Sequence, residues 1–369
     1  MASAATPPWL PEALWIERSE VDSSLAHRIR ARAPHVPVEV ADELATAEQV
    51  ASFADGKRRL VVQRHRGTFL HHCPAGTSGL VCCNYLVVNF GANCPFDCSY
   101  CFLQEYLSNN PALKVFTNVT DGLAEIDSVL QAHPQRTFRI GTGELVDSLA
   151  LDHLTDLTLE LVPFFAQRTN AILELKTKSD HIDNLLRVDP RGRVVVSWSV
   201  NAAVICNEDE PGTADLGSRI AAAIRIQDAG YGVGLHFDPL IAFDGWETGY
   251  RGAVERIFEA LDPGRVAWVS LGSLRMTPRL KATIRTRRRN GQPLSTRLLT
   301  GELVPGTDGK ERAWRGLRVR MYRSMLRWLR DVDARIPLYI CMEPAGVWEK
   351  AVGWVPSDRE VADSLVGMH

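Results

Sequence analysis

No apolar run of 18 residues occurs in the 369-residue sequence, so the chain is expected to have no membrane-spanning helix and no membrane partner. The sequence also lacks a large net charge. Its 42 basic and 44 acidic side chains leave −2, which excludes a globally basic nucleic-acid-binding protein. The first residues, MASAATPPWLPEALW, have no basic segment before an apolar core, so no signal peptide is predicted. We therefore expect a cytoplasmic protein.

Cysteine is sparse, but three of the eight cysteines fall within eight positions: Cys94, Cys98 and Cys101. In the cytoplasm such clusters are more often metal ligands or catalytic groups than disulfides. A zinc site normally has four protein ligands, and a closed iron–sulfur cluster usually has four cysteines. Three thiols on one loop instead indicate a [4Fe–4S] cluster with one open iron. The alternative is a zinc site completed by Cys82, Cys83 or a histidine.

Short apolar, β-branched runs alternate with helical patterns from about residue 85 onward. The predicted strands are 85–90, 137–141, 171–176, 194–200, 232–237 and 266–271, and the predicted helices include 151–166, 218–230 and 250–264. Six such units predict an α/β fold with a partial TIM-type (β/α)6 barrel, whose active site lies at the carboxyl ends of the strands. An open doubly wound sheet is the alternative.

Three regions are expected along the chain. Residues 1–82 form an N-terminal region without a strong period, residues 83–300 form the barrel, and residues 301–369 form a helical and strand extension that packs on it. The extension contains a predicted helix at 311–334, with an apolar stripe from Trp314 to Trp328, and a last apolar run at 337–342.

CxxxCxxC after the first strand of a βα barrel resembles the radical S-adenosylmethionine superfamily. More narrowly, the chain resembles the spore photoproduct lyase family. The matching stretches are CSYCFLQ (98–104), DHLT (152–155), TKSDHID (177–183), WSVN (198–201), EPGT (210–213), AAAIRIQDAGYGVG (221–234) and GWETGY (245–250).

The resemblance implies that Cys94, Cys98 and Cys101 bind three irons of a [4Fe–4S] cluster, and that the fourth iron binds S-adenosylmethionine. An electron, from a donor of the flavodoxin or ferredoxin type, would then cleave the cofactor to a 5′-deoxyadenosyl radical that takes a hydrogen atom from the substrate. The cofactor supplies the difficult chemistry, and the protein orients it.

The resemblance also implies cofactor contacts. Tyr100 would lie near the adenine, Lys178 would contact the cofactor carboxylate, and Glu144, in GTGE (141–144), would accept hydrogen bonds from the cofactor ammonium. Further contacts are expected from Ser199 and Asn201, at the end of the fourth strand, and from Phe102.

The sequence departs from the lyases at two positions. The family has a cysteine after the second strand that returns a hydrogen atom to the product radical, but GTGELVDS (141–148) has none, and Glu144 lies nearest to that place. The tyrosine expected after the third cysteine is Phe102. A thiol could instead come from Cys341, or from Cys82, Cys83 or Cys206. His236 and Asp238, at the end of the fifth strand, are expected to face the substrate.

Two basic stretches, 57–67 and 279–292, predict either phosphate contacts or a solvated face. The expected substrate is a nucleoside, nucleotide or DNA base. One hypothesis is repair of a DNA photoproduct with a rewired hydrogen return. The second is biosynthesis on a small nucleoside-like metabolite, by carbon–carbon bond formation or rearrangement. The third is a zinc-containing nucleic-acid-binding protein without catalysis.

Overall fold

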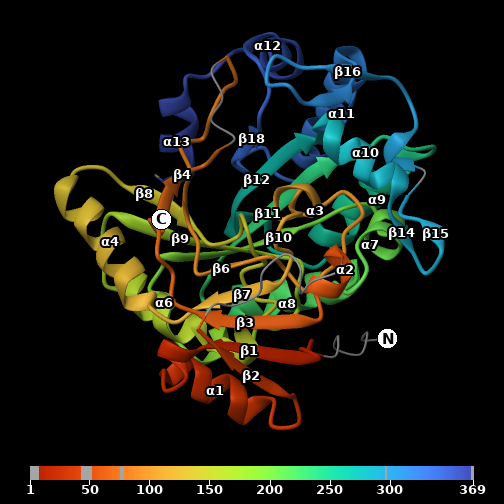
Figure 1. The fold of residues 1–369 in the computed structure, drawn as a ribbon. Coiled ribbons are helices and arrows are strands. Elements are labelled where there is room, and N and C mark those ends of the chain that lie inside the picture. Colours follow the sequence, from red (N-terminus) through yellow and green to blue (C-terminus); the bar gives the residue numbers. More distant parts are fainter. Residues whose placement is uncertain (1–7, 43–51, 75–78, 296, 367–369) are drawn as a thin grey trace.

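The computed structural model describes residues 8–42, 52–74, 79–295 and 297–366. Its centre is an eight-stranded sheet that curls into a partial barrel (Figure 1), in the order β18-β12-β11-β10-β9-β8-β5-β4. These strands are β4 (Leu70–His72), β5 (Leu86–Val88), β8 (Phe138–Gly141), β9 (Ala171–Thr177), β10 (Val194–Ser199), β11 (Gly232–Leu240), β12 (Val266–Ser273) and β18 (Leu338–Ile340). All neighbours run parallel except β4 and β5. The predicted (β/α)6 barrel is confirmed, with all six predicted strands in place.

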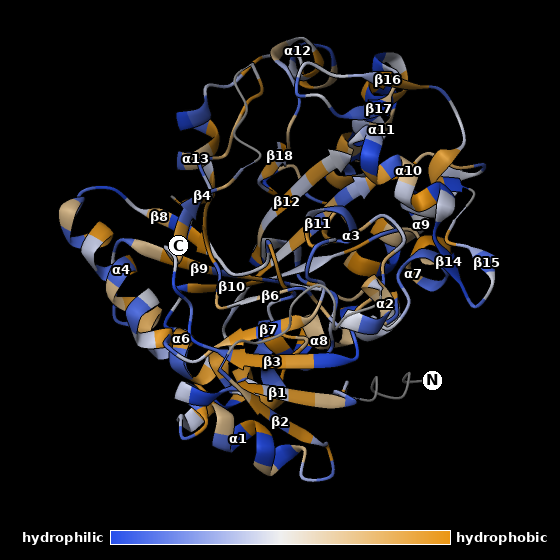
Figure 2. Cartoon of the chain, in the orientation of Figure 1, coloured by the Kyte–Doolittle hydropathy of each residue, from blue (hydrophilic) through white to orange (hydrophobic). Residues whose placement is uncertain are grey.

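Helices follow the strands and cover the convex face of the sheet. The main ones are α4 (Val119–Ala132), α6 (Leu157–Ala166), α8 (Leu216–Asp228), α9 (Trp246–Phe258) and α11 (Arg315–Val332). Figure 2 shows the apolar strands inside and the hydrophilic outer faces of α4 and α1 (Ser24–Arg32). No described helix has both the length and the apolar character that a bilayer crossing requires.

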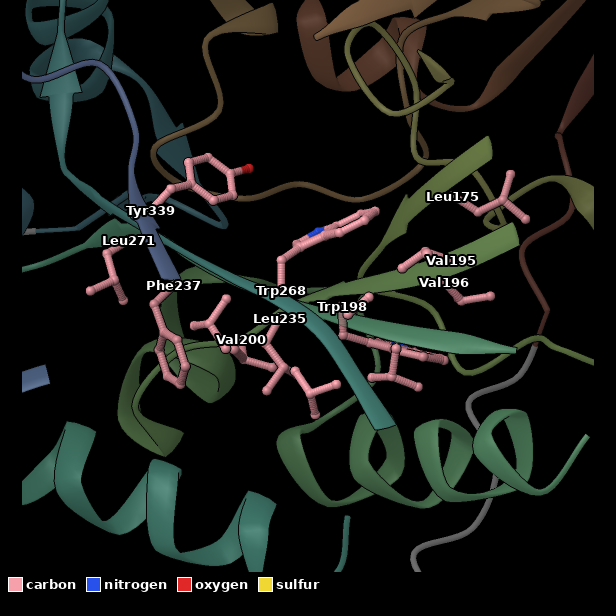
Figure 3. Packing of buried hydrophobic residues seen from close by; sticks show 14 of the residues in the cluster. Leu175, Val195, Val196, Trp198, Val200, Leu235, Phe237, Trp268, Leu271 and Tyr339 are labelled. Atoms are coloured by element: carbon pink, nitrogen blue, oxygen red, sulfur yellow. The ribbon is translucent and has the colours of Figure 1, made fainter. Parts of the chain in front are cut away.

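Side chains of the barrel strands alternate between the helix side and the lumen. Figure 3 shows Leu235 and Phe237 on the side of the helices, whereas Trp268 and Tyr339 lie on the opposite face of the sheet. All four are nearly fully buried. The two faces of the sheet therefore have different roles: one packs against the helices, and the other lines the lumen (Figure 3).

The predicted helix at 151–166 is divided into α5 (Asp152–Thr155) and α6. Asp156 separates them because its backbone is left-handed, with φ 53°. This conformation is uncommon outside glycine but tolerated by aspartate. The Asp156 carboxylate accepts a hydrogen bond from Arg32 at 2.7 Å, which ties the break to the N-terminal region.

The N-terminal region forms a second sheet, in the order β2-β1-β3-β7-β6. Its strands are β1 (Ala13–Glu17), β2 (Val38–Ala41), β3 (Arg59–Gln63), β6 (Gly91–Ala92) and β7 (Leu113–Phe116). The last two come from beyond residue 82, on either side of the three cysteines. The cysteine segment is thus anchored to the second sheet at both ends.

The C-terminal extension adds β16 (Leu303–Pro305) and β17 (Glu311–Ala313), and then α11 and β18. Strand β17 pairs with β16 on one side and with β13 (Arg275–Met276) on the other. The predicted helix start at 311 is wrong, because 311–313 is strand and α11 begins at Arg315. Trp314, predicted to pack in the core, is half exposed, whereas Met321 and Met325 are buried as expected. The division of the chain at residues 82 and 300 stays a prediction.

A buried ionic network lies in the barrel lumen. The Glu174 carboxylate accepts hydrogen bonds from His236 Nε2 at 2.7 Å and Trp268 Nε1 at 3.2 Å. The Arg139 guanidinium lies 3.5 Å from it and faces the Trp268 ring. Burial opposes the charge on Glu174, but Arg139 and His236 hold its pKa well below the usual range. Because these groups come from four strands, the network fixes the curl of the sheet.

Glu174→Gln should destabilise the protein by about 3–5 kcal/mol, because it leaves the buried Arg139 without its counter-ion. The free energy of unfolding in urea measures the effect. Glu255→Gln is the control: its carboxylate forms an exposed pair with Arg251 at 2.8 Å, and its loss should change stability by about 0.5 kcal/mol or less. Equal stabilities of the two variants would contradict the role of the network.

Candidate active site

The cysteine loop, residues 93–101, follows β5 and β6 at the carboxyl end of the first barrel strand. Gly91 begins β6, where a Cβ atom would lie 2.5 Å from the Lys114 carbonyl oxygen, so the close β6–β7 pairing requires glycine. Asn93 then adopts a left-handed backbone, and its Oδ1 accepts the Cys94 amide at 2.8 Å. The loop therefore turns sharply just before its first thiol.

The three thiols share one apolar environment. Cys94, Cys98 and Cys101 pack with Tyr100 in a small cluster of their own, together with Phe96 and Ala150. Burial raises the pKa of Cys94 to about 12 and that of Cys98 well above its usual value. In this state both are neutral thiols, and a metal would displace their protons on binding.

The donor set fits an iron–sulfur cluster. Cys94, Cys98 and Cys101 offer three thiol groups from one loop, and thiolate sulfur is the donor that iron–sulfur clusters use. A cluster distributes its cysteine ligands over separate iron atoms. Cys83, a suggested fourth zinc ligand, lies 3.3 Å from Arg139 Nη2 in the lumen instead.

One side of the loop is held by the EPGT segment (210–213). The Ser99 amide donates to the Asp209 carbonyl at 2.8 Å, and the Tyr100 hydroxyl donates to the Glu210 carboxylate. Arg219 binds the same carboxylate at 2.6 Å and the Ser199 carbonyl at 2.8 Å. Burial opposes ionisation of Glu210, but Arg219 and Lys178 lower its pKa, so it stays charged. The aromatic ring between Cys98 and Cys101 is thereby fixed.

The opposite side of the loop is held by the basic segment around β14 (Arg288–Arg289) and β15 (Gln292–Pro293). Arg287 Nη2 and Arg289 Nε donate to the Asp97 carboxylate at 2.7 and 3.0 Å, and Ser99 Oγ donates to the Leu294 carbonyl at 3.2 Å. These two arginines are therefore used to hold the loop, and the expectation of open phosphate contacts is wrong for them. Arg288 is exposed and binds only backbone carbonyls of its own segment.

Side chains of the second basic stretch, 57–67, also form contacts within the protein. Lys57 binds the cysteine loop. Arg58 pairs with Asp55 at 2.9 Å, and Arg64 pairs with Asp121 at 2.5 Å.

Lys178 lies beside the cysteine loop, and its predicted contact with a cofactor carboxylate stays a prediction. Its Nζ is 5.7 Å from the centre of the Tyr100 ring. Burial lowers its pKa while Cys98 and Glu210 raise it, and the net shift is upward. Asp147 accepts the Lys178 amide and the Thr177 hydroxyl, both at 2.7 Å, and so orients the strand end. A cation is thus presented next to the loop, where a cofactor carboxylate could bind.

Ser199 and Asn201 are buried at the end of β10. The Asn201 amide donates to the Pro239 carbonyl at 3.1 Å and accepts the Tyr250 hydroxyl at 2.6 Å. These contacts support the strand end itself, and contact of either residue with a cofactor stays a prediction.

The remaining predicted residues are distributed around the barrel. Glu144 faces Asn89, and burial raises its pKa. His236 belongs to the lumen network, where burial and Lys176 lower its pKa, so it is a neutral donor to Glu174. Asp238 forms a two-pronged pair with Arg275 at 3.0 and 3.2 Å.

Cys341 and Phe102 lie in contrasting environments. Burial and Asp238 raise the pKa of Cys341 strongly, so its thiol stays protonated. The Phe102 ring is 45% exposed and contacts the Tyr106 ring at 6.3 Å. Its position beside a cofactor stays a prediction.

Four contributors to the site carry no sequence assignment: Lys57, Asp147, Glu210 and Arg219. Glu210 stands in a family stretch, EPGT, which was a usable signal. Lys57 lies in the basic stretch 57–67 and Asp147 in GTGELVDS (141–148), but neither pattern indicates a contact with the cysteine loop. Arg219 has no such pattern, and each of the three reaches the site from a separate element.

Comparison with known proteins agrees with this geometry. A family model described as spore photoproduct lyase matches residues 9–289. The spore photoproduct lyase of Bacillus subtilis is 28% identical over 258 residues, which are 69% of this chain and 75% of that protein. A Geobacillus lyase is 30% identical over 163 residues, or 44% of this chain and 48% of that protein.

A solved structure, described as spore photoproduct lyase complexed with dinucleoside spore photoproduct, superposes with a TM-score of 0.78 at 21% identity. It covers 90% of this chain and 99% of that one, and shows the same fold. Together with the family match over most of the sequence, the barrel and its cysteine loop lead to one conclusion: the chain belongs to the spore photoproduct lyase family of radical S-adenosylmethionine enzymes.

Proposed function

We propose that the chain binds a [4Fe–4S] cluster through Cys94, Cys98 and Cys101 and acts on a nucleic-acid lesion of the spore photoproduct type. The observation that supports this most is the environment of the three thiols. They share one buried apolar cluster at the carboxyl ends of the barrel strands, beside the Lys178 ammonium. A metal site closed by four protein ligands binds no cofactor, so it would not need an ammonium group beside it.

When bound, the cluster supplies the electron that cleaves S-adenosylmethionine to a 5′-deoxyadenosyl radical. The residues of this chain bind and orient the cofactor. Lys178 offers its ammonium to the cofactor carboxylate, and Tyr100, fixed by Glu210, offers an aromatic ring to the adenine. Phe96 and Ala150 exclude water around the thiols. An external one-electron donor, of the flavodoxin or ferredoxin type, completes the system.

The substrate class is inferred from the relatives. One solved family structure holds a dinucleoside spore photoproduct, and its fold matches this chain along nearly its whole length. At the mouth of the barrel, Arg275 and Asp238 form a partly exposed pair that offers polar contacts to a base or sugar. We therefore place a DNA-type substrate above β11 and β12.

Glu144 cannot return a hydrogen atom to the product radical, because a carboxylate has no weak S–H bond. Another residue must therefore be the donor. Cys341 follows β18 directly and is a half-buried neutral thiol close to the Asp238–Arg275 pair. We propose that its hydrogen atom moves from Sγ to the carbon radical of the product. A C–H bond forms, an S–H bond breaks, and the unpaired electron is left on sulfur.

A second candidate is a biosynthetic reaction on a small nucleoside-like metabolite. The presence of Glu144 and Phe102, where the lyases have a cysteine and a tyrosine, favours it. In that case the product radical would form a new bond or rearrange before it is quenched.

Cys98→Ala should abolish 5′-deoxyadenosine formation by the reconstituted, dithionite-reduced protein, because one iron loses its ligand. Cys73→Ala, outside the loop, should leave both the iron content and the product unchanged. Chromatography of 5′-deoxyadenosine and iron analysis measure the two effects. A Cys98→Ala variant with undiminished cleavage would refute the ligation.

Deuterium placed at the reacting carbon of a dinucleoside spore photoproduct should appear in 5′-deoxyadenosine, as mass spectrometry can show. Nucleoside-like metabolites offered in parallel should not transfer deuterium. The reverse pattern would favour the biosynthetic candidate over lesion repair.

Cys341→Ser should keep 5′-deoxyadenosine formation but strongly reduce the yield of repaired dinucleoside per cleavage, because an O–H bond is too strong to donate. Cys73→Ser removes a different thiol near Cys341 and should keep the wild-type yield of repaired dinucleoside per cleavage. The ratio of the two products measures the effect. An unchanged ratio in Cys341→Ser would exclude this thiol as the donor.

A further inference from the structure

We propose that Lys57, together with Arg287 and Arg289, forms a cationic cradle that positions the cysteine loop and stabilises the reduced cluster. This inference rests on the proposed cluster ligation and concerns residues outside the motif. We define the cradle as these three side chains. They come from the N-terminal region and from the segment around β14, and they meet on residues 93–97.

Lys57 is the central member of the cradle, and its side chain is buried, with 6% of its surface exposed. Its Nζ donates to the Cys94 carbonyl at 2.6 Å, to the Phe96 carbonyl, and to Asn93 Oδ1 at 3.3 Å. An ammonium has three donors, so these contacts use all of them. Every acceptor is neutral, and two of them belong to the backbone at or near the first cysteine ligand.

The cradle holds more cations than the loop itself holds carboxylates. Asp97 is the carboxylate within the loop, and it is bound by both Arg287 and Arg289. Among the described residues, Lys57 forms no ion pair with a carboxylate. Three cations thus surround one anion.

Iron-bound thiolates would supply the missing negative charge. A buried ammonium without a counter-ion is costly, and its attraction to an anion is strong where water is excluded. The net charge near an iron–sulfur cluster is one of the factors that set its reduction potential. Reduction adds one electron to the cluster, so a neighbouring fixed cation stabilises the reduced form more than the oxidised form.

The position of Lys57 explains why the N-terminal region is close to the site. Lys57 caps the carboxyl end of α2 (Phe53–Gly56), and β3 begins two residues later. Its Nζ also lies 4.5 Å from the centre of the Phe53 ring, and the Arg287 guanidinium lies 5.1 Å from the same ring. Phe53 thus joins two members of the cradle on the outer side of the loop.

Lys57→Gln removes the charge but keeps two hydrogen-bond donors. In the full-length reconstituted protein, the midpoint potential of the cluster should shift to a more negative value, as measured by redox titration with electron paramagnetic resonance. Lys57→Arg keeps the positive charge, so its midpoint potential should lie close to the wild-type value. Arg58→Gln removes the same charge from the neighbouring exposed position and should leave the potential unchanged.

A Lys57→Gln variant that binds four irons and keeps the wild-type potential would overturn the proposal. If it binds iron poorly, Arg287→Gln provides the second test, because that guanidinium contacts Asp97 rather than a cysteine carbonyl. Its potential should also become more negative, and an unchanged value would equally overturn the proposal. Absence of any cluster in the wild-type protein would instead refute the proposed function.

Discussion

The cysteine loop must hold three thiols in place although its backbone belongs to no helix or sheet. Its polar groups therefore need partners from elsewhere, since buried backbone groups without hydrogen bonds are costly. Asp209 and Pro211 supply carbonyls on one side, and Lys57 supplies an ammonium on the other. The arginines around β14 complete the set through Asp97. The geometry of the site depends on this convergence of three distant segments.

The barrel provides the rigid base for that convergence. Its helix-facing side chains are apolar, whereas the lumen holds the charged groups Glu174 and Arg139. Buried charges of this kind are kept only when they are paired. The pairing across β8, β9 and β11 ties strands that also carry Lys178 and Asp238 at their ends. Residues far from the thiols thereby fix where the cofactor-side groups lie.

A member of the lyase family can differ from its relatives in the residue that returns a hydrogen atom to the product radical. The loop, Tyr100 and Lys178 are present, so the groups expected to generate the radical are retained. Glu144 and Phe102 carry neither a thiol nor a phenol, so neither side chain offers the weakly bound hydrogen atom that the resemblance leads one to expect there. Cys341 lies on another strand end, and a donor placed there would approach the substrate from a different side of the barrel.

The sequence by itself determined the six strands, the cysteine loop after the first of them and the family, because strand periodicity and thiol spacing are local properties. Even so, it placed the start of α11 four residues early and missed the break at Asp156, where a single backbone conformation decides the outcome. Only the tertiary structure decided that Lys57 and Arg287 hold the site. Lys57 lies 37 residues from its partner Cys94, and Arg287 lies 190 residues from Asp97. Contacts over such separations leave no periodic trace in the chain, since they arise from packing of the whole fold.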